Sequence, residues 1–370
     1  MKKFFVSFIL LAILGSTAYA LTEQELLDLQ RGALGADELE QYMPAETQNI
    51  FDHMGIDSGT SFDLGLRSIW RFAMGQMGGV FRQAARSAAI VMVVALLVGL
   101  VWSIYAGTDG TVPDYVPLVG VLATAGVAIG SSSAFIGLGA STLQQLDNFS
   151  TALLPTMAAA GAASGGITSA AVKYAGTVLF LNLLMTVTTR VVMPLIYAYI
   201  AASIGAAALD SEGLRGAANL LKWVTGVIIT TIMIAFVTYL TVTGVVSGSA
   251  DAVTTRVART TISTVLPVVG SIVSDAAETV LTGAAMVRNG IGVVGLLVVL
   301  AVCLVPILQL GAHYLMFKAA AGLSSAVTDK RVGSLIGSLG TAFGMVMGLT
   351  GAGAMMLFFS IISMMRMVIV

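Results

Sequence analysis

Two stretches decide the fold class: residues 289–317, NGIGVVGLLVVLAVCLVPILQLGAHYLMF, and residues 332–365, VGSLIGSLGTAFGMVMGLTGAGAMMLFFSIISMM. Neither contains Asp, Glu, Lys or Arg, and each exceeds the roughly 20 apolar residues that cross a bilayer. Backbone polar groups in hydrocarbon must be satisfied internally, so both stretches predict transmembrane helices. Further charge-free stretches are 87–108, 115–146, 148–172, 174–189, 191–209, 223–250 and 260–274.

The composition agrees with a membrane protein. Of the 370 residues, 57% are hydrophobic and 10% are charged, whereas a soluble domain carries about 25% charged residues. This excludes a soluble globular protein. The net charge of −1 gives no basic footprint for nucleic acid. One cysteine and two histidines are too few for a His/Cys zinc site, so we expect no bound metal.

The first 86 residues differ from the rest of the chain, because they hold 17 of the 37 charged side chains. Lys2 and Lys3, an apolar run over 4–14 and Ala-Tyr-Ala at 18–20 predict a signal peptide over 1–20; an uncleaved anchor is the alternative. Residues 21–86, with ten acids and five bases, are then an exported acidic head. Its arginine-bearing part, 62–86, predicts a helix that lies along the headgroups or packs on the body.

Residues 87–370 form the predicted polytopic domain, with clear spans near 88–106, 116–138, 223–246, 291–317 and 341–363. Residues 174–208 are either one kinked helix or a hairpin, because Arg190 and Pro194 interrupt them. Two segments rich in Gly, Ala and Ser, 148–172 with Pro155 and 260–287 with Pro267 and Gly270, suit re-entrant or interfacial broken helices as well as full spans. The predicted fold is all-α, with about six transmembrane helices plus re-entrant or interfacial helices.

Charge bias gives a trial topology. The basic loop 318–331 predicts a cytosolic position, which also places 210–222 in the cytosol. The four arginines between 67 and 86 conflict with this scheme, since they precede the first span on the exported side.

Polar residues at membrane depth are the usual pointers to function, because burying them is costly. For Arg190 and Asn182 the sequence leaves two interpretations open. Either they face a water-lined cavity, or Arg190 lies at the tip of a hairpin. For Asp275 and Glu278 the sequence leaves three interpretations open: they line a polar passage, they pair at an interface, or they belong to a solvated loop helix. Gln309 and His313, four residues apart, are expected to form a polar packing pair.

Glycine spacing predicts close helix packing. Gly333, Gly337, Gly340, Gly344 and Gly348 recur at intervals of 4, 3, 4 and 4, which places all five on one helical stripe. The stripe packs within the chain or forms a homo-oligomer interface.

Catalytic and cofactor signatures are missing from the sequence. No phosphate-binding G-x-x-x-x-G-K-[ST] motif occurs. His313 would need a serine partner for protease chemistry, and no motif surrounds Ser141 or Ser338. We therefore expect a protein that is not an enzyme and that needs no cofactor.

Several patches, in their order along the chain, resemble the stage III sporulation protein AE family of spore-forming Firmicutes. The set is more specific than any one patch, and it covers nearly the whole chain; Arg288 stands where the family pattern suggests lysine. The patches are FSTALLP (149–155), GGITSAAVKY (165–174), LPVVG (266–270), SDA (274–276), TVL (279–281), RNGIG (288–292) and Pro306.

The resemblance implies a subunit of the sporulation channel that joins mother cell and forespore, in the mother-cell membrane around the forespore. It implies as partners the other stage III sporulation membrane proteins, including an ATPase and ring-forming subunits. A self-contained secondary transporter with a broken-helix site at the membrane midplane is the alternative.

Overall fold

The computed structural model describes residues 32, 37–54, 61–107, 115–265 and 270–366. Within these ranges, the side chains of residues 37, 38, 40, 46, 54, 105–107, 131–135, 244–265 and 270–279 lie outside the description. Every element in the described chain is a helix, which confirms the all-α prediction. The expected signal peptide and Pro267 fall outside the described residues.

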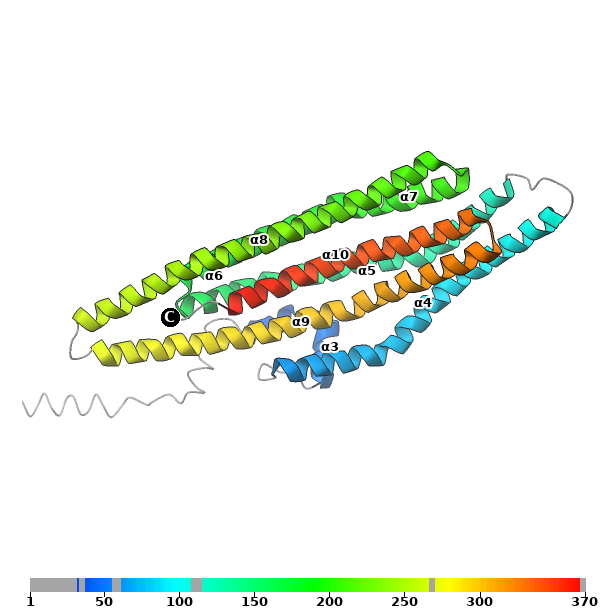
Figure 1. Ribbon diagram of the computed structural model, residues 1–370. Helices are drawn as coiled ribbons and strands as arrows, with labels where there is room; N and C mark the ends of the chain where they lie inside the picture. Colours follow the sequence, from blue (N-terminus) through cyan, green and yellow to red (C-terminus); the bar gives the residue numbers. More distant parts are fainter. Residues whose placement is uncertain (1–31, 33–36, 55–60, 108–114, 266–269, 367–370) are drawn as a thin grey trace, which may run out of the picture.

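Long helices make up almost the whole structure (Figure 1). They follow two short elements, the 3-10 helix η1 (Asp37–Tyr42) and α3 (Ala45–Met54), which contact α5 and α9. The long elements are α4 (Phe62–Gly107), α5 (Tyr115–Ala163), α6 (Ile167–Val187), the π-helical turn η2 (Thr188–Val192), α7 (Met193–Leu209), α8 (Glu212–Val265), α9 (Gly270–Val327) and α10 (Lys330–Met365).

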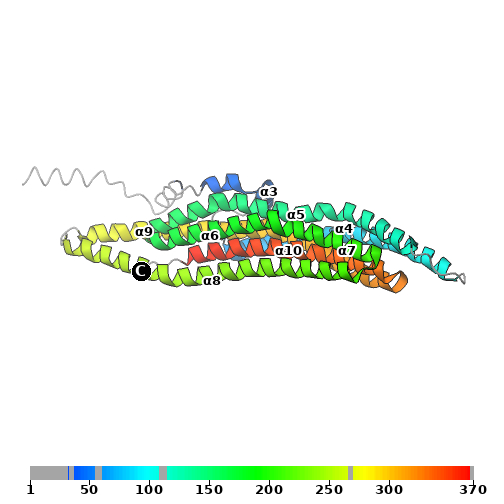
Figure 2. The ribbon, with the colours of Figure 1, turned by 90° about the horizontal axis from the view of Figure 1, so that it is seen from above.

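These helices lie side by side with alternating directions (Figures 1 and 2). We call one end of the bundle the Asp210 end, because it holds the α7–α8 turn at Asp210 and the α9–α10 turn at Asp329. Arg331 and Asp210 join these turns by a salt bridge of 3.0 Å. The opposite end, which holds the α5–α6 turn at Gly165, is the Gly165 end.

The two longest helices, α8 and α9, far exceed the length that a bilayer requires. α9 has 58 residues, which at about 1.5 Å per residue extend for roughly 87 Å. α8 has 54 residues, and the α8–α9 pair projects past the ends of α6 and α10 (Figure 1). The bundle therefore extends beyond the membrane thickness at the Gly165 end.

Five helices among the described residues are long and apolar enough to cross a membrane: Phe62–Ile104, Ile167–Leu209, Glu212–Thr243, Val280–Val327 and Lys330–Met365. They overlap five of the predicted spans and contain three of them completely. The sixth, 116–138, lies in α5, where the apolar helical stretch Tyr115–Gly130 is shorter. The chain is thus a multi-pass helical membrane protein.

Residues 167–209 form one continuous rod, so the hairpin alternative for 174–208 is wrong. The helix absorbs Pro194 through the π-helical turn, in which the Met193 N–H donates to the Thr188 carbonyl. Proline has no N–H for the carbonyl four residues earlier, and a π-bulge accommodates that loss without breaking the helix.

The arginine-bearing segment 62–86 packs on the body. It is the first half of α4, which continues without interruption through the expected boundary at residue 86. Ile69, Ala73 and Ala84 are buried, and Gly65 lies directly against Leu297 of α9. One narrow buried stripe therefore holds α4 on α9.

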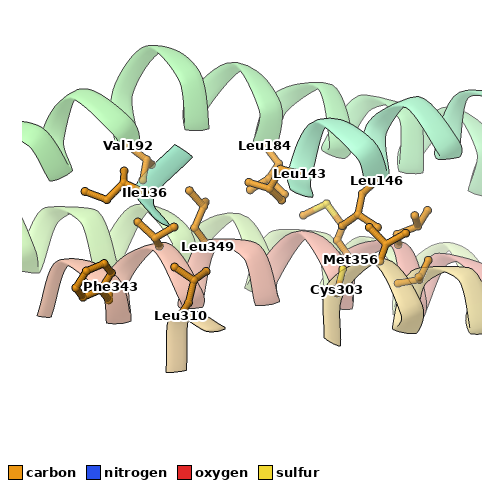
Figure 3. Packing of buried hydrophobic residues seen from close by; sticks show 14 of the residues in the cluster. Ile136, Leu143, Leu146, Leu184, Val192, Cys303, Leu310, Phe343, Leu349 and Met356 are labelled. Atoms are coloured by element: carbon orange, nitrogen blue, oxygen red, sulfur yellow. The ribbon is translucent and has the colours of Figure 1, made fainter. Parts of the chain in front are cut away.

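Large apolar side chains from α5, α6, α9 and α10 meet in the core (Figure 3). Leu143, Leu184, Leu349 and Met356 are almost fully buried there. Cys303 is a buried free cysteine among them, as expected for a small hydrophobic side chain.

Candidate functional site

The α5–α6 hairpin builds the candidate site, and its turn follows from the glycines in the sequence. Gly165 has φ of 94°, a left-handed conformation that glycine adopts without steric cost. The Gly166 N–H donates to the Gly161 carbonyl at 3.0 Å, which closes the end of α5 as in a Schellman motif. α6 therefore returns along α5.

A pocket of about 280 Å³ lies between these two helices. It contains room for several water molecules. Oxygen and nitrogen atoms from both helices line it beside apolar groups. The lining residues are Asp147, Ser150, Thr151, Leu154 and Pro155 of α5, and Tyr174, Val178, Leu181 and Asn182 of α6.

Asp147 is the acidic group of this pocket, and it lies on a turn of α5 that packs against apolar helices. Its turn of α5 is between Leu143, which packs on Gly353 of α10, and Leu153, which packs on Gly295 of α9. Both glycines belong to charge-free stretches. Among the described residues Asp147 forms no salt bridge. A half-buried carboxyl beside hydroxyls and an amide can hold a proton or coordinate a small cation.

Pro155 does not break α5, which continues to Ala163. Its missing N–H leaves one carbonyl of the preceding turn without its usual donor, a loss that packed helices tolerate. The chain reverses at residues 164–166 instead. Residues 148–172 therefore form the end of α5, the turn and the start of α6. The expectation of a broken or re-entrant helix at Pro155 is corrected accordingly.

Two buried cations hold helix ends together near the Gly165 end. The Lys173 Nζ donates to the Ser363 carbonyl in the last turn of α10 at 2.6 Å. The Arg288 guanidinium donates to the Ser164 Oγ just after α5 at 2.8 Å. A cation near a helix C-terminus interacts favourably with the helix dipole. Lys173 and Arg288 therefore fasten α6 to α10 and α9 to α5.

Hydroxyl groups add further links around α6. The Thr177 Oγ1 donates to the Ser360 Oγ of α10 at 3.1 Å, and the Tyr239 hydroxyl of α8 donates to the Val172 carbonyl at 2.7 Å. The Tyr239 ring lies directly against Gly176. Interhelical hydrogen bonds and close approach at small residues stabilise helix bundles in lipid, so α6 is fixed between α8 and α10.

The predicted polar residues do not gather in one place. Asn182 and Pro155 share the pocket. Arg190 is exposed in the π-helical turn, away from a hairpin tip. The side chains of Asp275 and Glu278 lie outside the described residues, and Gly270 is the first residue of α9.

His313 and Gln309 are neighbours on α9, as their spacing requires. The His313 Nδ1 donates to the Gln309 backbone carbonyl at 2.8 Å, and the imidazole is buried against the Phe343 ring of α10. The hydroxyls of Ser141 and Ser338 each donate to a carbonyl of their own helix. The contacts of His313 are those of a packed core residue.

The glycine stripe of α10 faces α9. A Cβ atom at Gly337 would lie 3.4 Å from the Ala321 Cβ, and one at Gly340 would lie 3.3 Å from the Phe317 Cβ. One at Gly344 would lie 3.0 Å from the Tyr314 ring, and Gly333 lies directly against Ser325. Gly348 has nothing within 4 Å. Four of the five glycines thus lie at an intramolecular contact.

Sequence reasoning missed Asp147. The signal was available, because Asp147 is the only charged residue between Asp114 and Lys173. Lys173 and Arg288 stood out in the sequence as boundaries of apolar stretches and as members of family-like patches, but the sequence assigned a partner to neither. Their partners, Ser363 and Ser164, are far away in the sequence, so the pairing depends on the fold.

Comparison with known proteins gives the family of this chain. The family model described as stage III sporulation protein AE matches residues 55–367. Stage III sporulation protein AE of Bacillus subtilis (strain 168) is 25% identical over 197 residues, which cover 53% of this chain and 49% of that protein. The alignment thus spans about half the length of this relative. No solved structure matches. Because the family model covers most of its length, the chain belongs to the stage III sporulation protein AE family.

Proposed function

We propose that this chain is a non-enzymatic membrane subunit of a sporulation-specific channel or secretion complex that links mother cell and forespore and is required for forespore development. The observation that carries the proposal is the family match over residues 55–367, which includes all the long helices and the α5–α6 pocket. The tightly joined helix bundle suits a subunit that assembles and supports a passage.

The proposed partners are the other stage III sporulation membrane proteins, including an ATPase and ring-forming subunits, in the mother-cell membrane around the forespore. In this arrangement the Asp210 end faces the cytosol. The basic residues Arg215, Lys330 and Arg331 at this end support that orientation, since positive loops favour the cytosolic side. The acidic head and the projecting α8–α9 pair would then face the forespore.

Clean deletion of the gene in its spore-forming host tests the role. We expect few heat-resistant spores and restoration by the full chain expressed from a second locus. Affinity purification of the restored protein from sporulating cells is expected to recover other stage III membrane proteins. Normal spore counts after deletion, in a host without a second copy, would contradict the proposal.

A secondary transporter is the second candidate, and the polar pocket at Asp147 and Asn182 is the observation that favours it. Purified protein in liposomes discriminates between the two. Uptake of a solute driven by an ion gradient, without any other protein, would favour the transporter. Stable copurification with sporulation membrane proteins and no uptake would favour the complex subunit.

A further inference from the structure

We propose that the α5–α6 pocket binds one monovalent metal cation, sodium or potassium, together with part of its water shell. The ligands are the Asp147 carboxylate, the Thr151 backbone carbonyl and the hydroxyl and amide oxygens beside them. The inference goes beyond the proposed function, because it follows from the pocket alone and applies equally to a complex subunit and to a transporter.

The pocket contains one negative charge and no positive charge. Asp147 contributes the half-buried carboxylate, and none of the other lining residues is basic. Asp147 also forms no salt bridge with any residue that the structure describes. A carboxylate that has lost part of its water is stabilised by a nearby opposite charge. A monovalent cation neutralises it, whereas a divalent cation would leave an excess positive charge among apolar helices.

Pro155 supplies a second ligand by freeing a carbonyl group. In an α-helix the Thr151 carbonyl points towards residue 155 and accepts its N–H, but proline has no N–H to donate. α5 remains helical through Pro155, so the carbonyl keeps this direction. Thr151 and Pro155 both line the pocket, which places the free carbonyl oxygen at its wall. Backbone carbonyls without a helical donor are cation ligands in membrane proteins.

Two hydroxyl groups of the pocket can act there only as acceptors. The Ser150 Oγ donates to the Asp147 backbone carbonyl at 2.8 Å, and the Thr151 Oγ1 donates to the same carbonyl at 3.0 Å. Each hydroxyl has one proton, so both oxygens have only lone pairs left for the pocket. Asn182 adds an amide group from α6. Such oxygen ligands suit a hard cation, and they do not require the His/Cys set of a zinc site.

The size and the opening of the pocket also fit an ion. A volume of about 280 Å³ holds a cation with several water molecules, since a water molecule takes about 30 Å³. Ser150 is 4% exposed, whereas Thr151 and Asn182 are exposed. The pocket therefore has a buried wall and an open side through which an ion enters. Its walls, α5 and α6, lie side by side (Figures 1 and 2).

Thermal unfolding of the purified full chain in detergent tests the site, because an ion that binds the folded state raises the unfolding midpoint. The probes are NaCl and KCl, each compared with N-methyl-D-glucamine chloride at equal ionic strength. We expect a saturable rise of the midpoint for the wild type. Asp147→Asn should lose this rise. Asp63→Asn, which removes the same charge from an exposed ion pair with Arg67, should keep it.

A pair of proline variants separates cation binding from general stability. Pro155→Ala restores the N–H that engages the Thr151 carbonyl. We therefore expect the affinity for the cation to fall by about tenfold, although α5 gains a hydrogen bond. Pro306→Ala makes the same change inside α9, away from the pocket lining, and should leave the affinity unchanged. Binding of radioactive sodium, with potassium as competitor, measures the affinities directly.

Two results would overturn the proposal. One is an equal dependence of the midpoint on sodium and potassium in Asp147→Asn and in the wild type. The other is a wild-type midpoint that changes with pH but with neither cation, which would assign the carboxyl to proton binding. If Asp147→Asn does not fold, Pro155→Ala decides, and an affinity equal to that of Pro306→Ala would contradict the site. These measurements need no sporulating host, so their failure is distinct from failure of the proposed function.

Discussion

Asp147 is a carboxyl group among apolar helices. Removing a charged carboxylate from water costs free energy, and an apolar residue at this position would not have that cost. Hydroxyls from its own helix and the Asn182 amide from α6 line the same pocket. Lys173 and Arg288 are also buried polar groups, but each is bonded to a helix end. At the scale of single residues, the two buried cations thus have a structural role in joining helices, whereas Asp147 lines a pocket.

We expect Asp147→Asn to lower the yield of heat-resistant spores by about an order of magnitude, because the variant keeps the size of the side chain and removes its charge. Membrane abundance, measured by immunoblot, should be unchanged. Asp147→Glu should retain partial function. Asp63→Asn, which removes an exposed ion pair with Arg67, is the matched control and should sporulate normally. Full function of Asp147→Asn would assign the carboxyl no role.

Gly165→Ala should destabilise the protein by roughly 1–2 kcal/mol, since an alanine at φ of 94° places its Cβ against the backbone. Thermal unfolding in detergent measures the change. Gly290→Ala lies in α9 with nothing within 4 Å and should not be destabilised. Equal midpoints for the two variants would show that the α5–α6 turn does not need the left-handed glycine.

At the scale of elements, the α9–α10 hairpin shows how glycines allow close helix packing. In lipid the hydrophobic effect does not drive helices together, so this close packing stabilises the pair. The glycines of α10 lie along α9 from Ser325 to Tyr314, so the backbones approach closely over several turns. α6, η2 and α7 solve a different problem, because the π-helical turn keeps one rod intact across Pro194.

We expect Gly340→Val to lower stability by about 1–3 kcal/mol through overpacking, because the Lys318 backbone nitrogen lies only 3.4 Å from the Cβ position. Gly348→Val has the same helix propensity and nothing within 4 Å, so it is the control. Thermal unfolding of both variants in detergent checks the difference. A larger loss for Gly348→Val would mean that the stripe contacts another molecule at that residue.

At the scale of the whole molecule, helices of alternating direction connect two ends that are held together by different contacts. The turns at the Asp210 end are joined by Arg331 and Asp210. At the Gly165 end, buried cations join the helix ends, and α8 and α9 extend beyond them (Figure 1). If the bundle crosses the membrane once per helix, the two ends lie on opposite sides.

Cysteine labelling checks this arrangement. Glu212→Cys and Ala326→Cys lie at exposed positions near the Asp210 end, and Ala163→Cys lies at an exposed position near the Gly165 end. In vegetative cells that express the chain, where no forespore membrane is present, we expect a membrane-impermeant maleimide added to intact protoplasts to label Ala163→Cys and to label the other two only after lysis. Cys303 is 3% exposed and should give little background. Labelling of all three from outside would contradict the crossing.

The sequence by itself determined the class of this protein and most of its spans. Charge-free stretches longer than the bilayer thickness have one structural solution, because their backbone groups must bond within each segment. Local spacing also predicted that Gly333, Gly337 and Gly340 share one face, since helical periodicity is a property of the segment alone.

The tertiary structure decided what each face contacts. Proline alone does not tell whether a helix breaks. α5 continues through Pro155, because packed helices tolerate the missing N–H, and the π-helical turn η2 accommodates Pro194. The pairings of Lys173 with Ser363 and Arg288 with Ser164 join residues more than a hundred positions apart. Such contacts depend on how whole helices align, and no local pattern encodes that alignment.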